Sequence, residues 1–155
     1  MKNVIFHIDV NSAFLSWEAV YRLKNGGSVD LRDIPSAVGG DRSKRRGIIL
    51  AKSIPAKAFG VRTGEPIVDA MRKCPSLTII PSHHGMYKEF SKKFMDILRE
   101  YTPEVEKYSI DEAFMNMTGM ERLLGEPVAF AHKLKDRIRT ELGFTVNIGI
   151  SSNKL

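Results

Sequence analysis

The 155-residue sequence holds one cysteine, Cys74, and no apolar run that approaches the roughly 18 consecutive residues of a membrane-spanning helix. One cysteine excludes an internal disulfide framework, which indicates a reduced, cytoplasmic setting and favours Cys74 as a small buried residue. The N-terminus is not expected to be a signal peptide, because His7 and Asp9 interrupt its apolar residues. No internal repeat or low-complexity segment is visible. We therefore expect an ordinary domain without membrane contact.

Acidic residues are the minority among the charges, with 18 Asp and Glu against 24 Lys and Arg, and the net charge is +6. This surplus suits a polyanionic partner such as nucleic acid, although many basic proteins bind none. Charge alone does not identify the function, which the candidate sites must indicate.

Hydrophobic periodicity predicts alternating strands and helices. A helix is expected after an N-cap at Asn11-Ser12, and it ends at Asn25-Gly26-Gly27. The second half reads strand, helix, hairpin, helix, strand, which predicts an α/β (α+β) fold: an antiparallel-rich sheet of the split βαβ kind with helices on one face. Strands are expected at 4–8, 35–38, 47–50, 77–80 and 144–150, a hairpin at 105–116, helices at 86–101 and 127–142, and short helical pieces at 56–60 and 67–71.

The most unusual segment is 108–114, where Asp111 and Glu112 sit side by side in an otherwise apolar hairpin. Adjacent strand residues point to opposite faces, so both acids serve one site only at a bend or hairpin tip. Asp9 closes the first strand in a similar way. Acids at the ends of core strands indicate a site for a hard cation such as Mg²⁺ or Mn²⁺. The alternative is that Asp9 caps the next helix and the hairpin acids are exposed turn residues.

The histidines offer weaker candidates. His7 lies within a strand and His132 on a helix face, where packing or surface roles are expected. His83 and His84 form a loop pair that would bind a metal only in a minority of such cases.

Four segments resemble the motifs of a known family. Residues 6–14, 56–61, 108–114 and 149–154 follow the order of motifs in Y-family DNA polymerases, in the branch of bacterial DNA polymerase IV (DinB) and UmuC-like proteins. The resemblance implies that 1–11 and 78–155 form the catalytic palm and 12–77 the small fingers. It also implies that the thumb and little-finger domains lie beyond Leu155, which agrees with N-cap chemistry at Ser151-Ser152-Asn153 where the sequence stops. We therefore expect a truncated, N-terminal catalytic part.

The implied activity is template-directed DNA synthesis of the low-fidelity, translesion type that acts in repair of DNA damage. By resemblance, Asp9 and Asp111 bridge two Mg²⁺ ions, for which Mn²⁺ can substitute, and Glu112 completes the primer-side site. The backbone carbonyl of Val10 is a further expected ligand. The implied partners are primer-template DNA and a dNTP, with a sliding clamp as a candidate partner of the missing C-terminal region.

Three further roles follow from the resemblance. Phe14 falls at the steric gate that rejects a ribose 2′-hydroxyl, Lys154 matches a lysine that binds the triphosphate, and Ser109 lies where it can position primer or substrate groups. On residues alone, Phe14 reads as a core residue, Lys154 as an exposed lysine and Ser109 as a hydroxyl bonded to backbone.

The fingers depart from the family pattern. Y-family polymerases usually have Thr, then Asn-Tyr-x-Ala-Arg, and the Tyr and Arg hold the triphosphate. Here Ala51, Ser53, Ile54 and Lys57 occupy these positions, and Ser53 and Lys57 are the remaining nucleotide-binding candidates. Ile54 has no hydroxyl, and Lys57 keeps the charge but loses the bidentate fork. The altered fingers therefore predict slower catalysis of the same reaction.

A basic segment joins two expected strands. It is either a solvated loop or a contact to template phosphates. Its basic residues are Arg42, Lys44, Arg45 and Arg46.

Two rival functions remain open. A non-catalytic nucleic-acid or protein-binding relative is compatible with the altered fingers, although the three acids argue against it. A palm-type nucleotidyl cyclase is suggested only by Gly39-Gly40-Asp41, which matches the start of the GGDEF signature of such enzymes. Arg42 follows where that signature has an acid.

Overall fold

The computed structural model describes residues 2–40 and 47–154. The chain divides into two compact units: unit 1 comprises Met1–Asn11 and Tyr87–Leu155, and unit 2 comprises Ser12–Met86. The basic segment with Arg42, Lys44, Arg45 and Arg46 lies outside the described residues. Within the described ranges, no helix is both long and apolar enough to cross a membrane.

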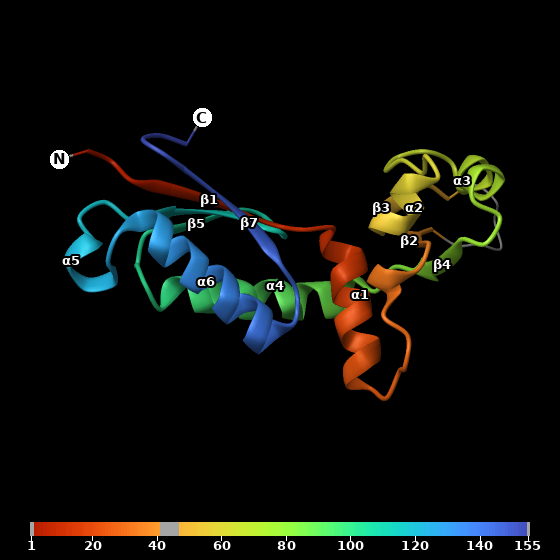
Figure 1. The fold of residues 1–155 in the computed structure, drawn as a ribbon, viewed down its shortest axis with the longest axis horizontal. Helices are drawn as coiled ribbons and strands as arrows, with labels where there is room; N and C mark the ends of the chain where they lie inside the picture. Colours follow the sequence, from red (N-terminus) through yellow and green to blue (C-terminus); the bar gives the residue numbers. More distant parts are fainter. Residues whose placement is uncertain (1, 41–46, 155) are drawn as a thin grey trace. The chain divides into compact units, whose positions relative to one another are not determined.

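Unit 1 is built on a four-stranded sheet in the order β5-β6-β1-β7, in which every neighbouring pair is antiparallel. Helices α4 and α6 run along one face of this sheet (Figure 1). The fold class predicted from the sequence is therefore confirmed. The elements are β1 (Ile5–Val10), α4 (His84–Arg99), β5 (Val105–Ser109), β6 (Glu112–Asn116), α5 (Glu121–Leu124), α6 (Pro127–Leu142) and β7 (Val146–Ser151).

Aromatic side chains fill the space between the sheet and its two helices. The ring of Phe6 on β1 lies 6.1 Å from that of Phe130 on α6. The ring of Phe144, just before β7, lies 6.1 Å from Phe90 and 6.3 Å from Phe94 on α4. Since strand residues alternate between faces, this core places the alternate residues of β1 on the opposite face, which no described helix of unit 1 covers.

The ends of α6 follow from local chemistry. The Glu126 carboxylate caps the helix by accepting hydrogen bonds from the amides of Val128 and Ala129, and Pro127 occupies the first turn. Gly143 ends the helix in a left-handed conformation with φ 86°. These signals are readable in the sequence, and the predicted helix at 127–142 is confirmed.

Unit 2 has a three-stranded sheet in the order β3-β2-β4, with β2 antiparallel to β3 and parallel to β4. Its core has two clusters, one around Leu15 and Val38 and one around Ile49 and Ile67. Cys74 is fully buried in the second cluster, as predicted. The elements are α1 (Ala13–Lys24), η1 (Leu31–Asp33), β2 (Ser36–Gly39), β3 (Ile49–Lys52), α2 (Ile54–Ala58), α3 (Ile67–Lys73) and β4 (Thr78–Pro81).

Two local expectations differ from the structure. The strand expected at 77–80 is present as β4, but it pairs with β2 in the sheet of unit 2, whereas the sequence pattern grouped it with the strands of the second half. Ile80 packs in the cluster around Leu15, which explains this choice of sheet. Ser12 occupies the N-cap position of α1, but with φ 44° and without a capping hydrogen bond from its side chain.

Candidate functional site

The pairing of β1 with β6 brings two acids together that lie far apart in the sequence. Asp9, near the end of β1, is the register partner of Glu112, the first residue of β6. The amide of Val10 donates a hydrogen bond of 2.9 Å to the carbonyl of Asp111 in the hairpin loop. Asp9, Asp111 and Glu112 therefore gather at one end of the sheet of unit 1.

The hairpin tip explains how adjacent acids share one site. Residues 110 and 111 form a turn between β5 and β6, and the register shifts between Lys107 and Ser109. Such an irregularity re-aims side chains next to it. The Ser109 hydroxyl lies 2.8 Å from Asp111 Oδ1 and 3.0 Å from Glu112 Oε2. Ser109 thus contacts both carboxylates, and the backbone-bonded alternative does not apply.

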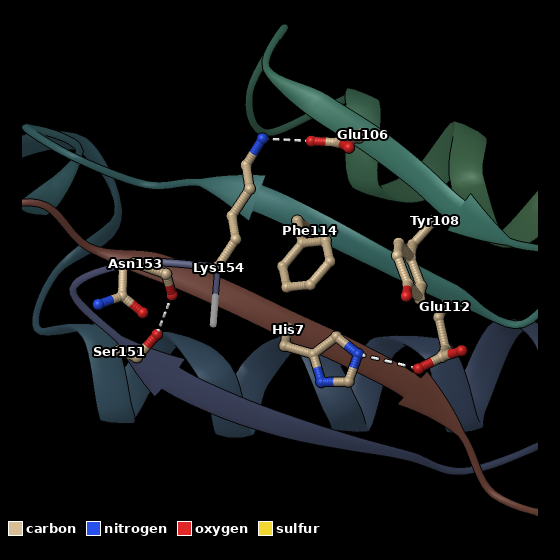
Figure 2. Close-up of a pocket in the computed structure, with 8 residues that line it drawn as sticks. All are labelled: His7, Glu106, Tyr108, Glu112, Phe114, Ser151, Asn153 and Lys154. Atoms are coloured by element: carbon tan, nitrogen blue, oxygen red, sulfur yellow. Dashed lines mark hydrogen bonds and ion pairs between the residues drawn. The ribbon is translucent and has the colours of Figure 1, made fainter.

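His7 is a member of this group that the sequence interpretation missed. Its Nε2 lies 3.1 Å from Glu112 Oε1, and its ring centroid lies 4.9 Å from that of Phe114 (Figure 2). The sequence feature that could have identified His7 is the period-two alternation of the strand, which puts His7 on the same face of β1 as Asp9.

Electrostatics at the site oppose ionisation of Asp9. Burial raises the pKa of the Asp9 carboxyl group above its ordinary value of 3.8, the charges of Asp111 and Glu112 raise this pKa further, and His7 counteracts them. Asp111 and Glu112 therefore repel the charge of Asp9, and a divalent cation would relieve this repulsion.

The donor chemistry fits a hard cation, because carboxylate oxygens are the ligands that Mg²⁺ prefers. In residues 2–40 and 47–154, however, no three His, Cys, Asp or Glu side chains converge closely enough to hold an ion.

A hollow of about 540 Å³ lies on the uncovered face of the sheet of unit 1. The Lys154 ammonium forms an ion pair with Glu106 beside it (Figure 2). Ser151 pairs with Ile5, whereas Asp9 pairs with Asn147, and four strand residues span about 13 Å. The structure therefore places Lys154 toward the opposite end of β1 from the acids. The lining residues are His7, Glu106, Tyr108, Glu112, Phe114, Ser151, Asn153 and Lys154.

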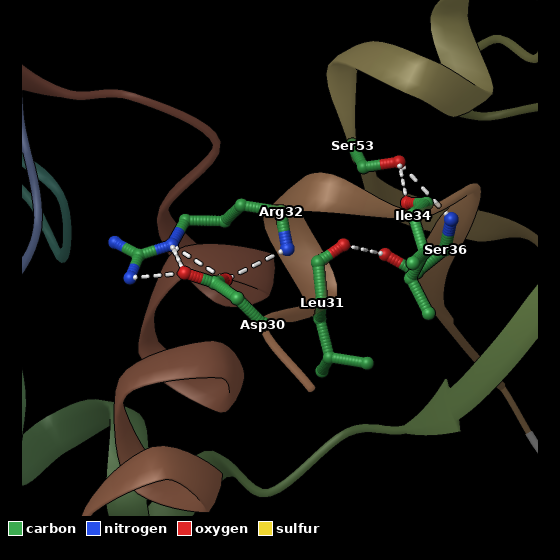
Figure 3. A network of polar contacts seen from close by, with 6 residues as sticks. All are labelled: Asp30, Leu31, Arg32, Ile34, Ser36 and Ser53. Atoms are coloured by element: carbon green, nitrogen blue, oxygen red, sulfur yellow. Dashed lines mark hydrogen bonds and ion pairs between the residues drawn. The ribbon is translucent and has the colours of Figure 1, made fainter. Parts of the chain in front are cut away.

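Ser53 has a structural role in unit 2. Its hydroxyl accepts hydrogen bonds from the amides of Ser36 at 3.0 Å and Ala56 at 3.1 Å, and it donates one of 2.8 Å to the carbonyl of Ile34 (Figure 3). A hydroxyl has one proton and two lone pairs, so these contacts use its whole capacity. Ser53 is only 2% exposed, which leaves it poorly suited to contact a nucleotide.

The other expected nucleotide contacts also belong to unit 2. Phe14 is half-buried on α1, with its ring 6.1 Å from Trp17 and 6.4 Å from His84. Lys57 is exposed on α2, and the side chain of Ile54, in the same helix, is 80% exposed. Of the altered fingers positions, Ile54 and Lys57 therefore lie at the surface of unit 2, whereas Ala51 and Ser53 are buried.

His83, the residue before α4, contacts a buried carboxylate. His83 Nδ1 lies 2.7 Å from Glu18 Oε2, and the Glu18 side chain is 1% exposed. This contact pairs a buried carboxylate on α1 with the segment that leads into α4. Sequence reasoning did not single out Glu18, because a glutamate on a helix ordinarily faces solvent.

Comparison with known proteins gives a consistent result. The model of the impB/mucB/samB family matches residues 8–155. DNA polymerase IV of Clostridium acetobutylicum is 52% identical over 155 residues, which is 100% of this chain and 39% of that protein. DNA polymerase IV of Acetivibrio thermocellus is 39% identical over the whole chain and 37% of its own length. The chain thus spans about two fifths of the curated relatives that it matches.

Solved structures show the same fold. A Y-family DNA polymerase chimera aligns with a TM-score of 0.85 and 27% identity, covering 98% of this chain and 43% of the chimera. DinB from Sulfolobus solfataricus aligns with a TM-score of 0.82 and 26% identity, covering 97% of this chain and 42% of that protein.

Proposed function

Because this chain belongs to the impB/mucB/samB family of Y-family polymerases, we propose that it is the catalytic part of a template-directed DNA polymerase that synthesises across damaged DNA. The observation that carries the proposal is the gathering of Asp9, Asp111 and Glu112 where β1 meets the β5–β6 hairpin. Primer-template DNA and a dNTP are the proposed substrates. A solved relative, Dbh DNA polymerase, is described as an insertion ternary complex, which supports substrate binding on this fold.

Y-family DNA polymerases generally depend on divalent metal ions. Asp9, Asp111 and Glu112 would hold two Mg²⁺ ions, with the Val10 carbonyl as a further ligand. Once bound, the ions supply activation of the primer 3′-hydroxyl and neutralisation of the triphosphate. The chain itself holds the acids in place through the Ser109 hydroxyl and the β1–β6 pairing.

The roles proposed for other residues depend on their surroundings. Phe14 serves as the steric gate and Lys57 as the cation of the fingers, since both remain accessible in part. We leave Ser53 out of the nucleotide site, because its hydroxyl is saturated by backbone groups. Lys154 reaches a triphosphate only after it leaves Glu106.

Primer extension tests the proposal. The chain, together with any residues that follow it in its reading frame, is incubated with a primed template, dNTPs and Mg²⁺. We expect extension that Asp111→Asn reduces by about 10²–10³-fold, the usual effect of removing one preorganised electrostatic group. Extension that the variant leaves intact would contradict the assignment of Asp111.

A non-catalytic binding relative is the second candidate, favoured by Ile54 and Lys57 in place of the family's Tyr and Arg. It retains DNA binding without extension at any Mg²⁺ or Mn²⁺ concentration. A mobility shift on the same primed template, combined with the absence of primer extension, would identify the binding relative, whereas extension identifies the polymerase.

A further inference from the structure

Glu112 is held at both ends of its carboxylate. One oxygen, Oε1, lies 3.1 Å from His7 Nε2, and the other, Oε2, lies 3.0 Å from the Ser109 hydroxyl. A carboxylate with both oxygens engaged has little freedom to rotate. The Ser109 contact is shared with Asp111, so the contact from His7 is the one dedicated to Glu112.

The imidazole of His7 is itself fixed in position. His7 and Phe114 are register partners on β1 and β6, and their rings lie 4.9 Å apart at 32°. Both residues stand on paired strands, which hold side chains more accurately than loops do. Figure 2 shows the His7 ring directed toward Glu112, with the Phe114 ring next to it.

The polarity of the contact follows from the groups involved. An ionised carboxylate only accepts hydrogen bonds, so His7 Nε2 carries the proton and donates it. This arrangement orients Glu112 and leaves its negative charge available. Outer hydrogen bonds of this kind align carboxylate ligands at metal sites.

A packing role explains His7 poorly. The side chain is 41% exposed, and the alternation of β1 places it on the face opposite Phe6 and Ile8. The core-facing positions of β1 are taken by Phe6, Ile8 and Val10 instead.

We propose that His7 is a positioning residue that orients Glu112 toward a divalent cation at the Asp9–Asp111–Glu112 cluster. The inference rests on the proposed function, because it assumes that these acids bind the ion. It adds a residue outside the acids that tunes metal affinity.

The test measures Mn²⁺ binding by the 155-residue chain with electron paramagnetic resonance, which needs no polymerase activity. His7→Phe keeps a ring against Phe114 and removes the donor, so we expect about 10–100-fold weaker binding. His7→Gln supplies a donor again and should recover part of this loss. His132→Phe on α6, an exposed histidine remote in sequence from the acids, is the matched control and should bind like the unmodified chain.

The outcomes separate the role of His7 from the metal site itself. Unchanged or tighter Mn²⁺ binding by His7→Phe would overturn the inference and leave the proposed function standing. The same holds if His7→Phe loses thermal stability but keeps the Mn²⁺ affinity of the unmodified chain. Absence of Mn²⁺ binding by the unmodified chain would overturn the metal site and the role of His7 together. If His7→Phe does not fold, His7→Ala carries the same expectation.

Discussion

Among single residues, Asp9 has surroundings that disfavour its charged form. Burial and the charges of Asp111 and Glu112 raise its pKa above 3.8. A carboxyl group with a raised pKa in the folded chain contributes stability below its ordinary pKa, and this contribution is lost as the pH rises through the folded pKa. At neutral pH, the ionised Asp9 therefore destabilises the fold that positions it.

Asp9→Asn should consequently stabilise the protein at pH 7 while removing a proposed metal ligand. We expect a higher Tm in thermal melts followed by circular dichroism, by about 2–4 °C for each kcal/mol of relieved repulsion. The difference should shrink as the pH falls through the raised pKa of Asp9 toward 3.8, because the folded chain then holds Asp9 in its protonated form. Asp33→Asn removes an exposed carboxylate and should change stability by no more than about 0.5 kcal/mol. An equal Tm for Asp9→Asn and the unmodified chain would refute the repulsion.

Lys57 offers a second test on a single residue, in the fingers part of the proposed polymerase. Lys57→Ala removes an exposed cation and should raise the apparent KM for dNTP, whereas Lys57→Arg restores a bidentate fork and should lower it. A charge-assisted hydrogen bond contributes about 1.5–3 kcal/mol, so we expect roughly a 10- to 100-fold rise for Lys57→Ala in steady-state primer extension. If neither substitution changes KM, Lys57 does not contact the nucleotide.

At the scale of elements, the contact between α1 and the segment before α4 depends on one buried charge. Glu18 is 1% exposed on α1 and accepts from His83 at 2.7 Å. Removing one partner of a buried carboxylate costs about 1–3 kcal/mol, because the carboxylate loses part of its compensation. His83→Ala should therefore lower the free energy of unfolding of unit 2 by this amount.

Urea denaturation checks the His83 prediction, with the fluorescence of Trp17 as the probe, because the sequence has one tryptophan and Trp17 is fully buried in unit 2. His132→Ala on α6 removes an exposed imidazole in unit 1 and serves as the control. A transition at the same urea concentration for His83→Ala and the unmodified chain would mean that other contacts compensate Glu18 fully.

Elements that depend on local signals were predicted well from the sequence. The helix at 127–142 has Pro127 and Gly143 at its ends, and the hairpin at 105–116 has its turn at 110–111. The partner of each strand was harder to predict, because an apolar strand such as β4 fits more than one sheet. β4 consequently lies in the sheet of unit 2 and not in that of unit 1.

The features of the candidate site also separate into those that the sequence predicts and those that it does not. That Asp111 and Glu112 share a hairpin tip follows from the sequence, whereas the pairing of Asp9 with Glu112 spans more than 100 residues and was expected only from the family resemblance. The bond between His7 and Glu112 depends on a diagonal between two strands, which no local pattern encodes. The Lys154–Glu106 pair likewise depends on long-range strand register.

On the scale of the whole molecule, the two units have separate cores and separate proposed tasks. Unit 1 has an aromatic core and the acids, and unit 2 has two aliphatic clusters with Phe14 and Lys57. Units with their own cores need not unfold in one transition. Trp17 reports on unit 2 alone, so the two unfolding events can be followed separately.

This separation leads to a prediction for metal addition. Mn²⁺ at 100 times its Kd stabilises the unit that binds it by about 2.7 kcal/mol. Since all three acids belong to unit 1, the transition seen by far-ultraviolet circular dichroism should gain a component that shifts to higher temperature, while the Trp17 fluorescence transition stays in place. Asp111→Asn should abolish the shift, because it removes a ligand from the cluster. A Trp17 transition that moves together with the dichroism signal would show instead that metal binding in unit 1 stabilises unit 2, and that the chain unfolds as one cooperative body.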